Sequence, residues 1–216
     1  MEPLNNDSEM KVRIISGAVM AVMVLSALAL GGMFFIALIM IAALQMIREW
    51  DTITFNENIL WRMAGLVYVA IPCACLLWLR READGASLVL TLFLIVWATD
   101  IGAYFAGRLI GGPKLAPAIS PNKTWAGLGG GALAAALVAA IATSFSPVPS
   151  GVGNAIVLGL ALAVLGQAGD LFESWLKRRA DVKDSGTLIP GHGGLLDRVD
   201  GLILTTPVFA LLVWSA

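Results

Sequence analysis

The sequence predicts an all-α protein that crosses a membrane about seven times and carries a polar site on its cytoplasmic face. Of its 216 residues, 58% are hydrophobic and 13% are charged, about half the share of roughly 25% found in soluble domains. Such a composition cannot cover a water-facing surface, so it favours an integral membrane protein. The net charge of -1 and the lack of a basic stripe in the sequence argue against nucleic acid as a partner.

Seven apolar stretches are the expected membrane helices, because one span needs about 20 apolar residues. The stretch 13–47 is too long for one span, and Gly31-Gly32 at its middle predicts two short helices, 13–30 and 33–48. The later spans are expected at residues 60–79, 86–107, 124–145, 154–176 and 197–215. No soluble domain lies between them, so we expect one integral membrane domain over residues 1–216. Its parts are the N-terminal spans (13–85) and a core with the candidate catalytic residues (86–216).

Two features of these apolar stretches have a structural explanation. The run GLGGGALAAALVAA, residues 127–140, consists mostly of small residues that let neighbouring helices approach closely. Cys73 and Cys75 have no Cys or His near them in the sequence, so we interpret them as small apolar residues of a membrane helix.

The distribution of Lys and Arg predicts the orientation, because these residues gather on the cytoplasmic side. With the N-terminus in the cytoplasm, Arg80 and Arg81 lie on the far side, and the other twelve of the 14 Lys and Arg residues lie on the cytoplasmic side. This orientation also brings residues 108–123 and 177–197 to the same face, although they are far apart in sequence.

Asp100 stands alone as an acidic residue between positions 86 and 169. A carboxylate near the middle of a span costs about 2.5–3.5 kcal/mol on insertion scales. Asp100, Tyr104 and Arg108 recur every four residues and therefore share one helix face. Two interpretations stay open: a structural bridge from Asp100 to Arg108, or a polar face that lines a site.

The segment GGPKLAPAISPNKTWAG, residues 111–127, cannot be a continuous helix, because it contains Pro113, Pro117 and Pro121. Thr124 is placed to cap the following span. The free backbone N–H groups there, with Lys123 beside them, suit an anion. A capped helix with an interfacial Lys is the simpler alternative.

The segment 169–201 concentrates charge in an otherwise apolar chain. Asp170, Ser174 and Lys177 share one helix face, Glu173 is four residues from Lys177, and Asp197 and Asp200 lie three residues apart. The loop IPGHGGLLD between these helices could follow a phosphate chain with its backbone amides, although its His192 could equally be a plain turn residue. Three carboxylates beside Lys and Arg indicate a Mg²⁺ and phosphate site. A solvated loop would explain Lys177, Arg178 and Arg179 but not the carboxylates.

The stretch SWLKRRADVKDSGTLIPGHGGLLDRVD closely resembles the signature of the phosphatidate cytidylyltransferases, also called CDP-diglyceride synthases. The stretch DIGAYFAGRLIGGPKLAPAISPNKTWAG resembles a second block of that family, so the resemblance covers about residues 100–209 and the multi-span layout. Two positions depart from the family pattern: Asn122 replaces a Lys and Ala126 replaces a Glu. The matching residues of the first stretch are Ser174, Lys177, Arg178, Lys183, Asp184, Pro190, His192, Gly193, Gly194, Asp197, Arg198 and Asp200.

The resemblance implies that CTP and phosphatidate react to give CDP-diacylglycerol and pyrophosphate, with Mg²⁺ as cofactor and K⁺ as a candidate second cation. The metal ligands it implies are Asp170, Asp197 and Asp200, and Lys177 joins them as a catalytic residue. The implied substrate-binding residues are Asp100, Ser120, Lys123, Thr124, Ser174, Arg178, Lys183, Asp184, His192, Gly193, Gly194 and Arg198.

The resemblance also implies a place in the inner membrane of a bacterial cell, with the site facing the cytoplasm and membrane lipid around the chain. The oligomeric state is open, and a homodimer is one alternative. Other functions remain as alternatives: a CTP-dependent polyprenol or dolichol kinase, a cytidylyltransferase for another lipid phosphate, or an ion transporter, since acids inside membranes are usual in transporters. The D-G-x2-A-R spacing of the CDP-alcohol phosphotransferases is missing, because Leu-Ile-Leu-Thr follows Asp200-Gly201.

Overall fold

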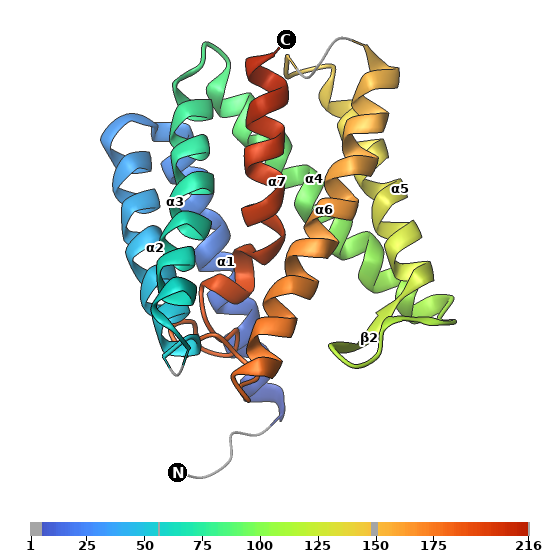
Figure 1. The fold of residues 1–216 in the computed structure, drawn as a ribbon. Coiled ribbons are helices and arrows are strands. Elements are labelled where there is room, and N and C mark those ends of the chain that lie inside the picture. The colour runs from blue at the N-terminus through green and yellow to red at the C-terminus, as the bar shows by residue number, and fades with distance from the viewer. Residues whose placement is uncertain (1–5, 56, 148–150, 216) are drawn as a thin grey trace.

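The computed structural model describes residues 6–55, 57–147 and 151–215, and over these residues the fold is a bundle of seven helices with one small hairpin (Figure 1). This confirms the prediction of an all-α membrane protein, because α1 to α6 are long and apolar enough to cross a membrane. The seventh helix is as long as a short span, but it carries Asp197, Arg198 and Asp200 near its start. The elements are α1 (Asn6–Leu30), α2 (Gly32–Ile53), α3 (Ile59–Arg81), α4 (Gly85–Leu109), β1 (Lys114–Ala116), β2 (Ser120–Thr124), α5 (Trp125–Ala142), α6 (Val152–Arg179) and α7 (Leu196–Trp214).

The break between α1 and α2 lies at Gly31, as predicted. Gly31 has φ 62 and ψ -151, a backbone conformation that residues other than glycine rarely adopt. A Cβ at this position would also overlap the guanidinium of Arg80, which donates to the carbonyl of Leu28 at 3.0 Å. The turn is therefore closed by the end of α3, and the long apolar stretch becomes two spans.

The helices alternate in direction, so one end of the bundle collects most of the polar segments (Figure 1). At this end α1, α3, α5 and α7 begin and α2, α4 and α6 end, and the hairpin lies beside them. The segments 108–123 and 177–197 therefore share one end of the molecule, as the charge pattern predicts. The compartment that this end faces stays a prediction.

Close packing of α4 against α5 uses the small residues of both helices. A Cβ at Gly102 of α4 would lie 2.7 Å from the carbonyl oxygen of Gly130, and a Cβ at Gly130 would overlap the methyl of Ala106. Glycine at these positions lets the two backbones approach closely, as predicted for the Gly/Ala-rich run. This contact fixes α4, which carries Asp100, relative to the hairpin that precedes α5.

The proline-rich segment between α4 and α5 forms a two-stranded antiparallel hairpin, in which Lys114 pairs with Thr124 and Ala116 with Ser120. The prediction that no helix crosses this segment is correct, but the strand pairing was not anticipated. Pro121 is tolerated in β2 because both strands of a two-stranded sheet are edges. Thr124 caps α5 as predicted: its hydroxyl accepts the amide of Gly127 at 3.0 Å.

Candidate active site

A polar cavity of about 740 Å³ lies between α4, α5, α6, α7 and the hairpin, at the end of the bundle where the polar segments collect. It is lined by carboxylates and cations from segments that are far apart in sequence, so the fold assembles most of the expected site. The predicted site residues that line it are Asp100, Ser120, Lys123, Thr124, Asp170, Lys177, Asp184, Asp197, Arg198 and Asp200.

Asp170 on α6 connects the hairpin to the helix core. The ammonium of Lys123 lies 2.5 Å from Asp170 Oδ2, and the hydroxyl of Ser174 donates to Oδ1 at 3.2 Å. The predicted shared face of Asp170 and Ser174 is therefore present. Lys123, on β2, holds the hairpin against α6 through this ion pair, so the hairpin forms one wall of the cavity.

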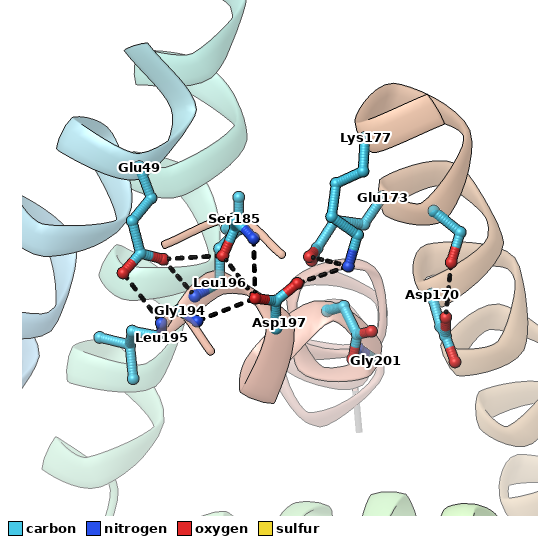
Figure 2. A network of polar contacts seen from close by, with 12 residues as sticks. Glu49, Asp170, Glu173, Lys177, Ser185, Gly194, Leu195, Leu196, Asp197 and Gly201 are labelled. Atoms are coloured by element: carbon cyan, nitrogen blue, oxygen red, sulfur yellow. Dashed lines mark hydrogen bonds and ion pairs between the residues drawn. The ribbon is translucent and has the colours of Figure 1, made fainter. Parts of the chain in front are cut away.

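Lys177 lies between two buried carboxylates (Figure 2). Its ammonium lies 3.1 Å from Glu173 Oε1 on the same helix, which confirms the predicted pair, and it also contacts Asp197 Oδ1 on α7. The side chains of Glu173 and Asp197 are 1% and 3% exposed. Because a buried charge needs a partner, the ion pair between Lys177 and Asp197 holds α6 against α7.

Asp197 also organises the loop that precedes α7. Its Oδ2 accepts the amide of Ser185 at 2.8 Å, the hydroxyl of Ser185 at 2.9 Å and the amide of Gly194 at 2.9 Å. A Cβ at Gly194 would overlap the Ser185 hydroxyl, so glycine is required where the loop folds over the carboxylate. Both oxygens of Asp197 are thus engaged within the protein.

Glu49 of α2, which the sequence analysis missed, supports the site from outside the cavity by holding the start of α7. Its side chain is buried, and its oxygens accept the amides of Leu195 at 2.9 Å and Leu196 at 2.7 Å (Figure 2). The hydroxyl of Ser185, also missed, is 3.1 Å from Oε2. These amides begin α7 and have no partner within the helix, and Leu195 has no side chain that could cap them. Glu49 therefore caps α7 from another helix. The sequence feature that points to it is an acidic residue near the end of an apolar helix.

Asp100 and Asp200 complete the acidic side of the cavity. Asp200 Oδ1 accepts the amide of Gly201 at 2.7 Å. Arg108 donates to the hydroxyl of Tyr104 at 2.6 Å, and over the residues that the structure describes no ion pair joins it to Asp100. The geometry thus favours the interpretation of Asp100 as a cavity residue over that of a structural bridge.

Several predicted residues lie outside the cavity lining. Ser174 donates to the carboxylate of Asp170, and Arg178 donates to the carbonyl of Ile119 at 3.5 Å. The ring nitrogen Nδ1 of His192 lies 2.9 Å from the hydroxyl of Ser16 on α1. The amides of His192 and Gly194 donate to Ile189 O and Asp197 Oδ2, so both are already engaged within the protein. The predicted residues outside the lining are Ser174, Arg178, Lys183, His192, Gly193 and Gly194.

The cavity has further polar lining that the predicted site did not include. Gln167 of α6 is buried, and it lines the cavity with Tyr104, Arg108 and Asn122. Neither Arg108 nor Arg198 has a carboxylate within 4 Å in the described parts of the chain. Two guanidinium groups without an acidic partner beside a polar cavity suit phosphate oxygens, which arginine can bind in a bidentate manner.

The carboxylates fit a hard cation that a ligand helps to bind. Residues 6–55, 57–147 and 151–215 contain no group of three His, Cys, Asp or Glu side chains close enough to hold a metal ion by themselves. However, Mg²⁺ is typically held by one or two carboxylates together with substrate phosphates. Asp170, Asp197 and Asp200 all line this cavity. Asp170 and Asp197 are paired with Lys123 and Lys177, and Asp197 accepts three further hydrogen bonds from Ser185 and Gly194. Asp200, followed by Asp170, is therefore the carboxylate that a cation could reach with the least rearrangement.

Comparison with known proteins agrees with this chemistry. Residues 53–216 match the model of the cytidylyltransferase family. The chain is 50% identical to the phosphatidate cytidylyltransferase of Brucella suis biovar 1 (strain 1330) over 152 residues, which is 70% of this chain and 56% of that protein. It is 40% identical to the phosphatidate cytidylyltransferase of Rickettsia bellii (strain RML369-C) over 211 residues, or 93% and 89% of the two chains. The aligned part thus spans little more than half of the Brucella relative.

Proposed function

We propose, from the premise that this chain belongs to the cytidylyltransferase family, that it transfers the cytidylyl group of CTP to phosphatidate. The products are CDP-diacylglycerol and pyrophosphate. The observation that carries the proposal is a cavity lined by Asp100, Asp170 and Asp200 together with Arg108 and Arg198, at one end of membrane-spanning helices. A lipid phosphate and a soluble nucleotide can meet at such a place. Relatives that bear the name phosphatidate cytidylyltransferase support the choice of substrates.

The reaction is an in-line displacement at phosphorus. An oxygen of the phosphatidate phosphate attacks the α-phosphorus of CTP, and the bond from that phosphorus to the oxygen bridging to the β-phosphate breaks. Pyrophosphate leaves with the bridging oxygen. The attacking phosphate is ionised near neutral pH, since the second pKa of a phosphate monoester is about 6. No strong general base is required, which agrees with a cavity that His192 does not line.

The main obstacle is charge repulsion, because an anion must approach a polyanion. Arg108 and Arg198 would bind phosphate oxygens and stabilise the charge that develops on them, and such fixed electrostatic contacts commonly provide the largest part of catalysis. Lys123 and Lys177 are neutralised by carboxylates, so we assign them to positioning the hairpin and α7 rather than to neutralising the triphosphate.

Mg²⁺ would be held by Asp170 and Asp200, and it would supply charge neutralisation and orientation of the phosphates. The ligand role that the family resemblance implies for Asp197 stays a prediction, as does K⁺ as a second cation. We also propose that the site faces the cytoplasm from the inner membrane of a bacterial cell. A homodimer remains a prediction, which the molar mass of the purified protein in detergent would test.

The direct test is turnover by the purified protein with CTP, phosphatidate and Mg²⁺, with detection of pyrophosphate and of the lipid product. The expected result is equal amounts of pyrophosphate and CDP-diacylglycerol, and Asp200→Asn serves as the inactive control. Release of CDP in place of pyrophosphate, with a polyprenol as acceptor, would indicate the lipid kinase. Ion flux in vesicles without CTP, and no release of pyrophosphate, would indicate a transporter.

A further inference from the structure

A second cavity, of about 500 Å³, lies beside the polar one and differs from it in chemistry. Its walls come from α1, α2, α3, α4 and α7 and are formed mainly by apolar side chains, among them Phe35, Ile39 and Phe93. Its volume lies in the range of about 300–1,000 Å³ that is usual for ligand sites. A triphosphate cannot occupy it, because a charged group buried among apolar side chains loses its hydration without compensation.

Arg198 connects the two cavities. It lines both of them, and it is the one charged residue among the described residues that line the apolar cavity. His192 lines the apolar cavity as well, and its contact with Ser16 ties α1 to the loop before α7. A ligand with an anionic head and an apolar tail could therefore place its head in the polar cavity and its tail in the apolar cavity, with Arg198 between them.

The wall that α1 contributes is only lightly packed. Within its apolar stretch 6% of the residues are buried, against 44% in α4, and this is the lowest share among the helices α1 to α6. A lipid chain could enter from the bilayer past this helix without crossing the polar cavity. We propose that the apolar cavity holds one acyl chain of the lipid substrate while its phosphate lies at Arg198. This inference rests on the proposed function, because it takes phosphatidate as the lipid.

The physical role of such a site is selection and orientation rather than affinity. A chain that leaves the bilayer for this cavity exchanges one apolar surrounding for another, since lipid tails are as apolar as the side chains of the cavity. Little binding energy is therefore gained from burial. The shape of the cavity can nevertheless discriminate between chain lengths and can place the phosphate, and correct placement is what accelerates the attack.

The first test compares dioleoyl with dioctanoyl phosphatidate in variants that narrow the cavity. Ala42→Phe on α2 and Ala21→Phe on α1 add a ring at lining positions, whereas Ala37→Phe adds the same ring at an exposed position of α2 that does not line it. We expect the ratio of kcat/KM for the long chain over the short chain to fall at least about fivefold in the two lining variants. The ratio should stay at the wild-type value in Ala37→Phe. An unchanged ratio in both lining variants, or the same fall in the control, would overturn the inference.

The second test does not need turnover. A phosphatidate with a photoactivatable group near the end of one acyl chain should label lining residues such as Phe35 and Phe93. A phosphatidylcholine probe with the same chain should not label them, because it lacks the free phosphate that Arg198 would hold. Equal labelling by both lipids, or labelling confined to lipid-facing residues such as Ala37, would contradict the acyl-chain site. If the wild-type protein released no pyrophosphate, the proposed function would fail, and labelling would still decide whether this cavity binds the chain.

Discussion

Asp197 and Asp200 are three residues apart on α7, yet their carboxylates have different surroundings. Both line the polar cavity. Asp197 contacts Lys177, Ser185 and Gly194, whereas the hydrogen bond that Asp200 accepts comes from the amide of Gly201. The first carboxylate is part of the packing between helices, and the second is available to a ligand. Substitution of Asp197 should therefore affect mainly stability, and substitution of Asp200 mainly turnover.

The first prediction concerns these two aspartates. Asp200→Asn should lower kcat/KM by about 10²–10³, the usual cost of losing one well-placed electrostatic group, and should leave the unfolding temperature unchanged. Asp197→Asn should lower the unfolding temperature, because Lys177 would lose one of its two carboxylate partners and the loop amides would lose a charged acceptor. Turnover at several Mg²⁺ concentrations and thermal unfolding in detergent measure both effects. The control is Asp181→Asn, because Asp181 is exposed with φ 56, where Asn is well tolerated. A stable, active Asp197→Asn would refute the organising role.

The second prediction concerns Glu49, which acts through Ser185 and the first amides of α7. In Glu49→Gln an NH₂ group replaces an oxygen that accepts backbone N–H groups, so donors would face donors in a buried place. Such an unsatisfied group costs about 1–3 kcal/mol. We expect faster hydrogen exchange in residues 180–196, a lower unfolding temperature and a marked loss of turnover.

The matched control for Glu49 is Glu57→Gln. Glu57 pairs with Arg179, whose side chain is 43% exposed, and such a surface pair contributes little to stability. This variant should resemble the wild type in exchange and turnover. If Glu49→Gln also showed wild-type exchange across residues 180–196, the capping role of Glu49 would be refuted.

At the level of single residues, the sequence predicts the contacts that follow helix periodicity and misses those that the fold creates. The pair of Glu173 with Lys177 and the contact of Ser174 with Asp170 are both four residues apart, so they can be found from spacing. Glu49 and Ser185 are separated by 136 residues. No periodicity connects α2 to the loop before α7, and only the packed bundle brings them together.

At the level of elements, apolar runs predict the helices well but not their ends, because the helices continue into charged segments. α1 begins at Asn6 and α6 ends at Arg179, whereas the apolar pattern predicts 13 and 176. Helices continue past the hydrocarbon region into the polar interface, where their charged residues are solvated. The hairpin was missed because its strands are only three and five residues long and β2 contains a proline.

The third prediction concerns the contact between α4 and α5. Gly130→Ala should destabilise the protein by about 1–3 kcal/mol, the usual cost of overpacking, because its methyl would overlap Ala106. Gly129→Ala is the matched control at the preceding residue, since a Cβ there has no atom within 4 Å among the described residues. Thermal unfolding and turnover of both variants provide the measurement. Gly130→Ala should also lower turnover, because α4 carries Asp100 and α5 follows the hairpin with Lys123. Equal stability of the two variants would show that the close approach is not needed.

At the level of the whole molecule, the segments 108–123 and 177–197 lie at the same end of the bundle (Figure 1). The polar cavity is at this end, with Lys123, Lys177 and Arg198 in its lining. The sequence predicts this arrangement because the direction of each span follows from the count of spans, and the distribution of Lys and Arg follows the same alternation. The depth and shape of the cavity could not be predicted, because they depend on how α4, α6 and α7 pack around Asp100, Asp170 and Asp200. The N-terminal helices also supply Glu49, and α1, α2 and α3 provide more than half of the residues that line the apolar cavity.

The last prediction is the compartment that this end faces. With the twelve positive residues on the cytoplasmic side, Ala118 at the hairpin and Thr187 in the loop before α7 should be cytoplasmic, and Ala83 between α3 and α4 should lie outside. All three residues are exposed, so each can be replaced by Cys in a background with Cys73→Ala and Cys75→Ala. In intact spheroplasts, a maleimide that cannot cross the membrane should label Ala83→Cys but neither Ala118→Cys nor Thr187→Cys. After permeabilisation all three should react, which shows that the unlabelled positions are accessible. Labelling of Ala118→Cys or Thr187→Cys in intact spheroplasts would reverse the orientation, and the cavity could then not draw on cytosolic CTP.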